Sequence, residues 1–297
     1  MEALEVYLRQ QQQRIETALD HFLPAPERYP MALVDAMRYS VFAGGKRLRP
    51  ILVLAAAEAV GSEAETVLGA ACALEYIHTY SMIHDDLPAM DNDDYRRGKP
   101  TNHVVYGEAM AILAGDALLT HAFELLSSPA LAERFEASLL LQVSHCLAHA
   151  AGSAGMIGGQ VVDMASEGQR VDLPVVEYIH RHKTAALIEA AVTIGGLLGG
   201  GTTEQVQALR TYGHQVGWAF QIADDILDVE GDPNVLGKAV GRDAEQEKAT
   251  YPAVVGLETS RQRATELIQQ GIAALARFDH QADQLRHIAT YIVSRNT

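Results

Sequence analysis

Apolar residues recur at helical spacing along almost the whole chain. Between Met31 and Phe42 they stand at i, i+3 and i+4, which is typical of a helix that buries one face. Most runs of this kind end at a glycine or a proline, where helices commonly stop. The pattern predicts helices at residues 1–20, 31–42, 51–60, 63–87, 103–127, 131–151, 155–167, 174–198 and 203–228, with two or more helices after residue 250.

Strands have no comparable signal in the sequence. No turn dipeptide lies between alternating β-branched runs, so no hairpin is predicted. The separators between the helical runs are short, and no linker divides the chain. The sequence therefore predicts an all-α protein, a large multi-helix bundle in which residues 1–297 form a single domain.

Two of the predicted helices finish with adjacent acidic residues, Asp85-Asp86 and Asp224-Asp225. A helix C-terminus already carries partial negative charge, so carboxylates there are destabilised unless a cation compensates for them. Oxygen-only ligands suit a hard divalent ion, and Mg²⁺ is commonly held by few carboxylates together with substrate phosphates. The two motifs predict Mg²⁺ binding, with solvated acidic helix ends as the alternative.

The spacing within each motif refines this prediction. Asp224 and Asp228 are i, i+4 on one helix and share a face, whereas Asp225 lies off that face. Asp85 and Asp91 would point in different directions on a continuous helix. The residue before Pro88 is restricted away from helical geometry, so the helix should end near residue 87 and a turn should bring Asp91 back beside Asp85.

Groups of arginine and lysine stand out in this chain because the chain as a whole is acidic. The chain has 297 residues and a formal net charge of −15, which argues against nucleic acid or an anionic membrane as a partner. Arginine and lysine nevertheless cluster beside the acidic motifs, and arginine grips phosphate oxygens with two parallel hydrogen bonds. These clusters predict two phosphorylated ligands, with a solvated basic surface as the alternative; they are Gly44-Gly45-Lys46-Arg47-Leu48-Arg49, Arg96-Arg97-Gly98-Lys99, and Lys238 with Lys248.

The compartment can be predicted from cysteine usage and the N-terminus. Cys72 and Cys146 lie inside apolar helical patterns, which favours buried thiols and a reducing cytoplasm. The first residues lack the basic-then-apolar layout of a signal peptide. No apolar run approaches the roughly 18 to 20 residues of a membrane span, so none is expected.

In order and spacing, these motifs resemble those of short-chain trans-prenyl diphosphate synthases, most closely the bacterial farnesyl diphosphate synthases. The resemblance implies the all-α isoprenoid-synthase fold with a central cavity, and a homodimer. It also implies Mg²⁺-dependent transfer of an allylic group, dimethylallyl or geranyl, from its diphosphate to isopentenyl diphosphate through a carbocation. The matching stretches are GGKRLRP at 44–50, EYIHTYSMIHDDLPAMDNDDYRRGKPTNH at 75–103, GGQVVD at 158–163, HKT at 182–184, FQIADDILDV at 220–229, and LGK with YP at 236–252.

The same resemblance implies a role for each matching residue. Asp85, Asp91, Asp224 and Asp228 would hold a Mg²⁺ cluster, with Asp86, Asp225 and Asp243 as weaker candidates. The allylic diphosphate would be bound by Arg96, Lys183, Thr184, Gln221, Lys238 and Lys248, and dipoles near Lys183, Thr184 and Gln221 would shelter the carbocation. Isopentenyl diphosphate would be bound by Lys46, Arg49, His78 and Arg97. No protein base stands out, which leaves the released diphosphate as the candidate proton acceptor.

Product length is expected to depend on Tyr80 and Ser81, which precede Asp85 by five and four residues. In the family that these motifs resemble, a bulky residue at the fifth position limits products to fifteen carbons, so Tyr80 favours farnesyl diphosphate. On an ideal helix, however, Tyr80 lies about 140° around the axis from Asp85, and Ser81 is the neighbour on the same face.

Several other activities are compatible with parts of the pattern. A geranylgeranyl diphosphate synthase has the same motifs, and a terpene cyclase shares the ionisation chemistry but binds one diphosphate. The second set of cations argues against the cyclase. A di-metal carboxylate oxidase would need two Glu-x-x-His motifs, and only Glu75 to His78 stands out in the relevant region. A non-catalytic homologue would be expected to have lost aspartates, yet both motifs are intact.

Overall fold

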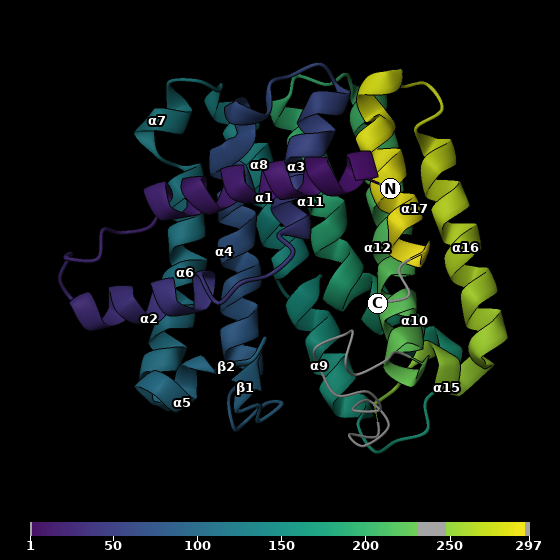
Figure 1. The fold of residues 1–297 in the computed structure, drawn as a ribbon, viewed down its shortest axis with the longest axis horizontal. Helices are drawn as coiled ribbons and strands as arrows, with labels where there is room; N and C mark the ends of the chain where they lie inside the picture. Colours follow the sequence, from purple (N-terminus) through teal and green to yellow (C-terminus); the bar gives the residue numbers. More distant parts are fainter. Residues whose placement is uncertain (1, 231–247, 295–297) are drawn as a thin grey trace. The chain divides into compact units, whose positions relative to one another are not determined.

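The computed structural model describes residues 2–230 and 248–294, and most of these residues are helical, as predicted (Figure 1). They form two compact units. One comprises Met1–Ile51 with Glu65–Ser144, and the other comprises Leu52–Ala64 with His145–Thr297. That the whole chain acts as one domain stays a prediction.

The first unit buries apolar side chains between α4 and its neighbours. Helices α4 and α6 lie side by side, with α1 and α2 packed against them (Figure 1). Tyr76 on α4 is fully buried, and its hydroxyl donates a hydrogen bond to the Leu19 carbonyl over 3.0 Å. The helices that belong wholly or partly to this unit are α1 (Glu2–Phe22), α2 (Met31–Val41), α3 (Leu48–Ala59), η1 (Ala64–Val67), α4 (Leu68–Asp85), α5 (Asn102–Tyr106), α6 (Glu108–Leu126), α7 (Pro129–Ala132) and α8 (Ala137–Ala151).

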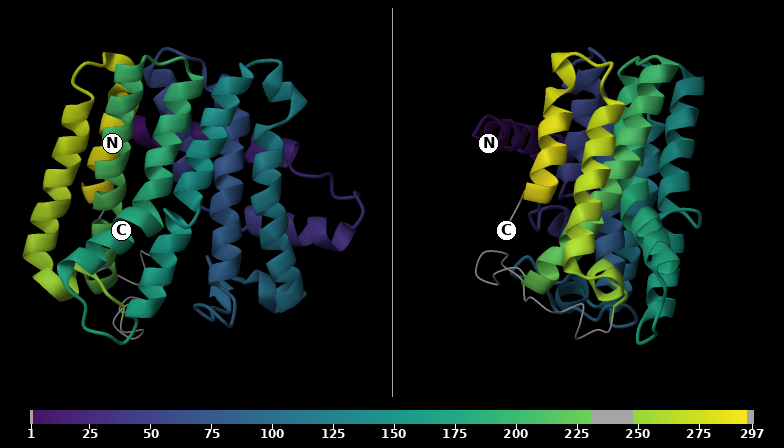
Figure 2. Two further views of the ribbon diagram at one scale, coloured as in Figure 1. Left: turned by 180° about the vertical axis from the view of Figure 1, so that it is seen from behind. Right: turned by 90° about the vertical axis from the view of Figure 1, so that its right-hand side faces the viewer.

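The second unit is built around its longest helix, α12. Helices α11 and α16 lie along α12, and α17 also contacts it (Figure 2). Tyr212 on α12 is fully buried and donates a hydrogen bond to the Leu285 carbonyl over 2.6 Å. The further helices of this unit are α9 (Met156–Ser166), α10 (Leu173–Ile179), η2 (His180–Ala185), α11 (Ala186–Leu198), α12 (Thr203–Glu230), α15 (Tyr251–Val255), α16 (Leu257–Ala274), η3 (His280–Ala282) and α17 (Asp283–Ser294).

A short hairpin in the first unit was not predicted. Strands β1 (Tyr95–Arg96) and β2 (Lys99–Pro100) pair antiparallel. Their turn, Arg97-Gly98, has φ values of 53° and 73°, and positive φ at both central residues is typical of a type I′ turn. Each strand has two residues, too few to show alternation in the sequence, so the prediction of no hairpin was wrong here.

Some predicted helices are divided. The stretch 103–127 breaks at Gly107, whose φ of 84° is accessible mainly to glycine, and the stretch 131–151 becomes α7 and α8. The stretch 174–198 stays helical, but residues 180–185 form a π-helical turn between α10 and α11. Such turns are rare and frequently occur at functional sites.

Helix α6 bears on the membrane prediction. Within the described residues, one segment, Glu108–Ala132, is long and apolar enough to cross a membrane by length and composition. A core helix of a soluble protein, which is mostly buried, can pass the same test, whereas 39% of the qualifying window is buried here. The expectation of no membrane span therefore stays a prediction.

Candidate active site

The first acidic motif begins at the last residue of α4, Asp85. Beyond it the chain reverses, and the Asp91 N–H donates a hydrogen bond to the Asp85 carbonyl over 2.9 Å. The turn expected at Pro88 is thus confirmed, and it returns Asp91 to the end of the helix. Both aspartates are half-buried. Two carboxylate-bearing residues therefore share one helix end, where the helix dipole offers their charge no stabilisation.

Asp86 differs from these two neighbours because it is buried and bound to a protein cation. Its carboxylate accepts a hydrogen bond from Arg96 Nε over 2.7 Å, and the same oxygen forms an ion pair with Arg96 Nη2 at 2.6 Å. Burial raises the pKa of Asp86, and the Arg96 guanidinium opposes that shift. The structure thus pairs a weaker metal candidate with a residue predicted to bind the allylic diphosphate.

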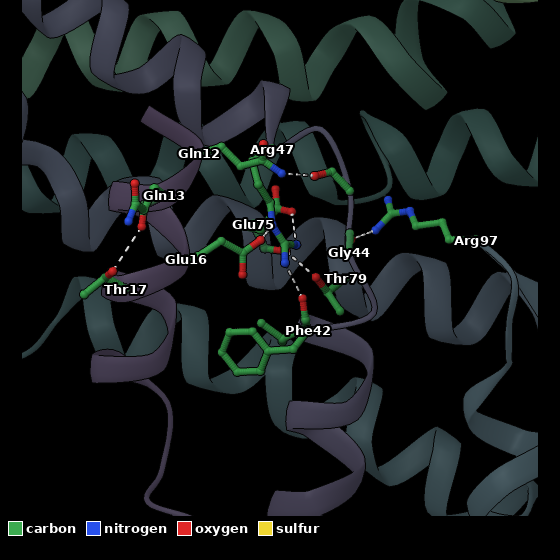
Figure 3. Close-up of polar contacts among 12 residues, drawn as sticks. Gln12, Gln13, Glu16, Thr17, Phe42, Gly44, Arg47, Glu75, Thr79 and Arg97 are labelled. Carbon is green, nitrogen blue, oxygen red and sulfur yellow. Dashed lines mark hydrogen bonds and ion pairs between the residues drawn. The ribbon is translucent and has the colours of Figure 1, made fainter. Parts of the chain in front are cut away.

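The glycine turn contains one cation that faces inward. Arg47 is 3% exposed, and its guanidinium lies 2.7 Å from both Glu16 and Glu75 and 2.5 Å from the Val41 carbonyl (Figure 3). Its φ is 50°, in the left-handed region that few residues other than glycine adopt. Arg47, which was not among the predicted diphosphate ligands, is thus held by the carboxylates of Glu16 and Glu75.

The remaining predicted cations of the first unit lie around the same turn. Arg97 donates a hydrogen bond to the Gly44 carbonyl (Figure 3). A Cβ at Gly45 would stand 2.5 Å from the Arg97 guanidinium, and the Gly45 φ of 136° is itself accessible mainly to glycine. Lys46 follows directly and is exposed.

Arg49 lies beside His78, with its Nη1 3.5 Å from the imidazole Nε2. Burial and the nearby arginines, Arg49 first among them, hold the pKa of His78 well below its usual value. The imidazole is therefore neutral and adds no charge of its own. His78 and Arg97 also line a small cavity of about 40 Å³ with Arg96 and Asp86.

The second acidic motif lies near the C-terminal end of α12, as predicted. Asp224 is half-buried and Asp228 is 6% exposed. Asp225 is 3% exposed and accepts two hydrogen bonds, from the Tyr251 N–H at 2.8 Å and from Gln221 Nε2 at 2.9 Å, and its Oδ2 lies 3.1 Å from His180 Nε2. The Asp225 carboxylate is therefore occupied by protein donors.

Four predicted ligands of the allylic diphosphate meet around one cavity of the second unit. This cavity has a volume of about 100 Å³, and its lining includes Lys183, Thr184, Gln221 and Lys248. Thr184 Oγ1 donates a hydrogen bond to Gln221 Oε1 over 2.7 Å, and Gln221 in turn donates to Asp225. The π-helical turn carries both Lys183 and Thr184, which places a cation and a hydroxyl side by side on the wall.

Two further residues of this cavity carry chemistry that the sequence reasoning did not assign. Asp163 forms an ion pair with Lys183 Nζ over 2.6 Å, and His180 is bound to Asp225. A Cβ at Gly159 would stand 2.2 Å from the Lys183 backbone nitrogen, so glycine allows α9 to approach the π-helical turn. The motif GGQVVD could have indicated the role of Asp163, because Gly159 and Asp163 are i, i+4 and lie on one helix face.

The chain-length candidates lie deeper along α4. Tyr80 is 5% exposed, and its ring meets the His84 ring edge-on with centroids 5.7 Å apart. Ser81 donates a hydrogen bond to the His78 carbonyl over 2.8 Å. Lys238 and Asp243 lie outside the described residues.

The candidate metal ligands are of the chemical type that Mg²⁺ prefers. Both motifs offer only carboxylate oxygens, and Asp85 and Asp91 meet at one helix end. Across residues 2–230 and 248–294, no three His, Cys, Asp or Glu side chains converge on one point. Mg²⁺ rarely needs such a cage, since one or two carboxylates with substrate phosphates and water complete its octahedron. The residues present therefore fit a metal that arrives with a phosphorylated ligand.

Comparison with known proteins identifies relatives over nearly the full chain. The chain is 49% identical over 290 residues to a dimethylallyltranstransferase of Fischerella ambigua, covering 97% of this chain and 83% of that protein. It is 46% identical over 294 residues to a geranylgeranyl diphosphate synthase of Cyanophora paradoxa, covering 99% and 97%. The identity is also 46% over 294 residues to a farnesyl diphosphate synthase of Geobacillus stearothermophilus, covering 99% and 98%.

Solved structures agree with these relatives. An FPP/GFPP synthase from Zymomonas mobilis superposes with a TM-score of 0.86 at 40% identity, over 98% of this chain and 99% of that one. A geranylgeranyl pyrophosphate synthetase from Pyrococcus horikoshii gives a TM-score of 0.88 at 31% identity, over 99% of both chains. The all-α isoprenoid-synthase fold is thereby confirmed. Residues 30–290 match the family described as polyprenyl synthetase, and the chain belongs to that family of prenyltransferases.

Proposed function

We propose that the protein condenses an allylic diphosphate, dimethylallyl or geranyl, with isopentenyl diphosphate to give mainly farnesyl diphosphate. The observation that carries this proposal is the cavity of the second unit, where Lys183, Thr184, Gln221 and Lys248 converge. Two cations and two neutral dipoles on one wall suit a diphosphate that departs from a carbon becoming positive.

Isopentenyl diphosphate would be bound in the first unit by Lys46, Arg49, His78 and Arg97. The contact between Arg49 and His78, and the seat of Arg97 over the glycine turn, support this assignment. Because the pKa of His78 is lowered, the imidazole would serve as a neutral hydrogen-bond partner beside cationic arginines. Isopentenyl diphosphate keeps its diphosphate in the reaction, so this site needs cations to bind it and no means of promoting its ionisation.

The allylic diphosphate would be bound by Lys183, Thr184, Gln221 and Lys248, with Arg96 and Lys238 as further ligands. Its C–O bond breaks, and the bonding electron pair leaves with the diphosphate. The allylic carbon then bonds to the terminal alkene carbon of isopentenyl diphosphate, and loss of a proton forms the new double bond. The released diphosphate would accept that proton. The Gln221 and Thr184 dipoles would stabilise the cation without reacting with it.

Asp85, Asp91, Asp224 and Asp228 would hold Mg²⁺, with Asp243 assisting. When bound, Mg²⁺ would neutralise the charge that grows on the leaving diphosphate. Asp86 and Asp225 are assigned a supporting role, because Arg96 binds the first and because Tyr251 and Gln221 donate hydrogen bonds to the second.

Farnesyl diphosphate is favoured as product by the buried ring of Tyr80, which would limit the length of the growing chain. Geranylgeranyl diphosphate is the second candidate, since relatives at 46% identity carry both names. We further expect a homodimer in the cytoplasm.

Product analysis tests the proposal directly. The purified protein is incubated with Mg²⁺, isopentenyl diphosphate and either dimethylallyl or geranyl diphosphate, and the dephosphorylated products are identified by gas chromatography. Fifteen-carbon farnesol should dominate with either substrate. Mainly twenty-carbon product would correct the chain length, cyclic hydrocarbon would indicate a cyclase, and failure of both condensations would refute the proposed function.

A further inference from the structure

Tyr80 lies on a different face of α4 from Asp85. If Tyr80 limits product length, some neighbouring residue must therefore hold its ring in the required orientation. Its ring meets His84, four residues later and on the same helix face, with an interplanar angle of 76°. Among the described residues its buried hydroxyl has no hydrogen-bond partner. The orientation of the phenol ring therefore depends on packing, and His84 is the aromatic ring it meets.

His84 is itself fixed by α6. Its Nε2 lies 3.1 Å from the Ile112 carbonyl, to which it donates a hydrogen bond, and 4.0 Å from the Asp116 carboxylate. The ring lies over Gly115, where a Cβ would stand 2.1 Å from Nε2. Real Cβ atoms do not approach this closely, so any side chain at Gly115 would displace the imidazole. Glycine at position 115 thus provides the space that His84 occupies.

We infer that His84, seated on Gly115, is a positioning residue that sets product length by holding the Tyr80 ring in place. The chain of contacts runs from the α6 backbone through the imidazole to the phenol. The inference rests on the proposed function and assigns a role to two residues outside the predicted site. Loss of the imidazole should let the Tyr80 ring turn away and admit one more isopentenyl unit.

Product ratios in a double-mutant cycle test this inference. The measured quantity is the amount of product one isopentenyl unit longer than the main wild-type product, relative to that product. His84→Ala should raise this ratio by about tenfold, a typical discrimination for loss of a pocket contact. Gly115→Ala should raise it in the same direction, because the new methyl group displaces the imidazole. The double variant should match His84→Ala alone, since the methyl group then meets an empty space.

Two controls separate positioning from general destabilisation. His84→Phe keeps a ring against Tyr80 but loses the hydrogen bond to the Ile112 carbonyl, so its ratio should lie between those of the wild type and His84→Ala. Gly69→Ala also adds a methyl group where α4 packs against other residues. The added Cβ would stand 3.5 Å from its nearest neighbour, the Leu131 side chain, so it fits without a clash and the product ratio should not change. Melting temperatures of all variants show whether any shift follows stability instead.

Each outcome bears on the inference. An unchanged ratio in His84→Ala and Gly115→Ala, or effects that add in the double variant, would overturn it. The same holds if Gly69→Ala shifts the ratio as far as Gly115→Ala. If the wild-type protein forms no condensation product, the proposed function fails as well, whereas normal wild-type product with unresponsive variants refutes this inference alone.

Discussion

The backbone N–H of Tyr251 donates a hydrogen bond to the Asp225 carboxylate over 2.8 Å. Tyr251 is the first residue of α15 and follows Lys248 by three positions, so this bond fixes the start of a helix close to a predicted phosphate ligand. A helix N-terminus has unsatisfied N–H groups and favours a carboxylate. An aspartate within a predicted metal motif thus stabilises the protein wall beside that motif.

Because Asp225 accepts this hydrogen bond, substitution of Asp225 should affect stability, whereas substitution of its neighbour Asp224 should affect Mg²⁺ binding. Asp225→Asn should lower the free energy of unfolding by about 1–3 kcal/mol, because the Tyr251 and Gln221 donors lose a charged acceptor. Asp224→Asn should raise the Mg²⁺ concentration needed for half-maximal activity, which Asp225→Asn should change less. Urea unfolding and Mg²⁺ titration of the same preparations measure the two effects. Equal shifts of the Mg²⁺ midpoint in both variants would assign Asp225 to the metal as well.

Lys183 is expected to act on the allylic substrate. Lys183→Ala should reduce kcat/KM for geranyl diphosphate by about 10²–10³-fold, as is typical when one preorganised donor to a developing charge is removed. Steady-state kinetics with each substrate varied in turn measure this loss. The KM for isopentenyl diphosphate should stay within a few-fold of wild type, and a comparable rise in that KM would contradict the assignment.

Arg47 and Arg49 are close in sequence but are expected to have different roles. Arg47 should stabilise the fold, and Arg49 should bind isopentenyl diphosphate. Arg47→Met would leave Glu75 buried without its cation, and breaking such a pair typically costs about 3–5 kcal/mol of stability. Arg49→Met should change stability little and raise the KM for isopentenyl diphosphate. Urea midpoints and steady-state kinetics distinguish the two. The assignment would be reversed if Arg47→Met left stability intact and weakened binding instead.

The lowered pKa of His78 predicts a loss of stability in acid. The unfolded chain takes up a proton near pH 6.5 whereas folded His78 does not, so stability falls as pH drops below that value. The slope from one such group is at most about 1.4 kcal/mol per pH unit. His78→Gln should flatten the dependence of the unfolding free energy between about pH 7 and pH 5. An unchanged slope would show that the folded protein also protonates this histidine.

Tyr80 is expected to limit the length of the product. Tyr80→Ala should shift the main product to twenty carbons or more, because a buried ring is replaced by space. Chromatography of the dephosphorylated products measures the shift. Ser81→Ala tests the second candidate: it removes one small hydroxyl that is bonded within its own helix, so it should lengthen the products less than Tyr80→Ala does. An equal or larger shift in Ser81→Ala would assign the main role to Ser81.

Much of this architecture follows from local rules that act along the chain. Helical periodicity predicts the long helices, and the restriction before Pro88 predicts that Asp91 returns to Asp85. Side-chain direction is harder to predict. The inward position of the Arg47 side chain, for example, involves contacts with Glu16 and Glu75, which are 31 and 28 residues away in sequence. Periodicity does not encode such contacts, because they depend on tertiary packing.

The same limit applies to the cavity of the second unit. Lys183, Thr184 and Gln221 could be selected from their motifs, but Asp163 and His180 could not be assigned, because their partners lie on other elements. The pairing of Asp163 with Lys183 depends on the close approach that Gly159 allows. Likewise, the two-residue strands of the hairpin depend on the turn at Arg97-Gly98 and have no periodic signal.

The π-helical turn at residues 180–185 changes which residues of α10 and α11 share a helix face. One extra residue in a turn rotates everything after it by about 100° relative to an uninterrupted α-helix. Residues of α10 and α11 that a continuous helical wheel would place on one face therefore point in different directions. A relative lacking one residue here could retain both helices, yet it would present a different residue where this chain presents Lys183.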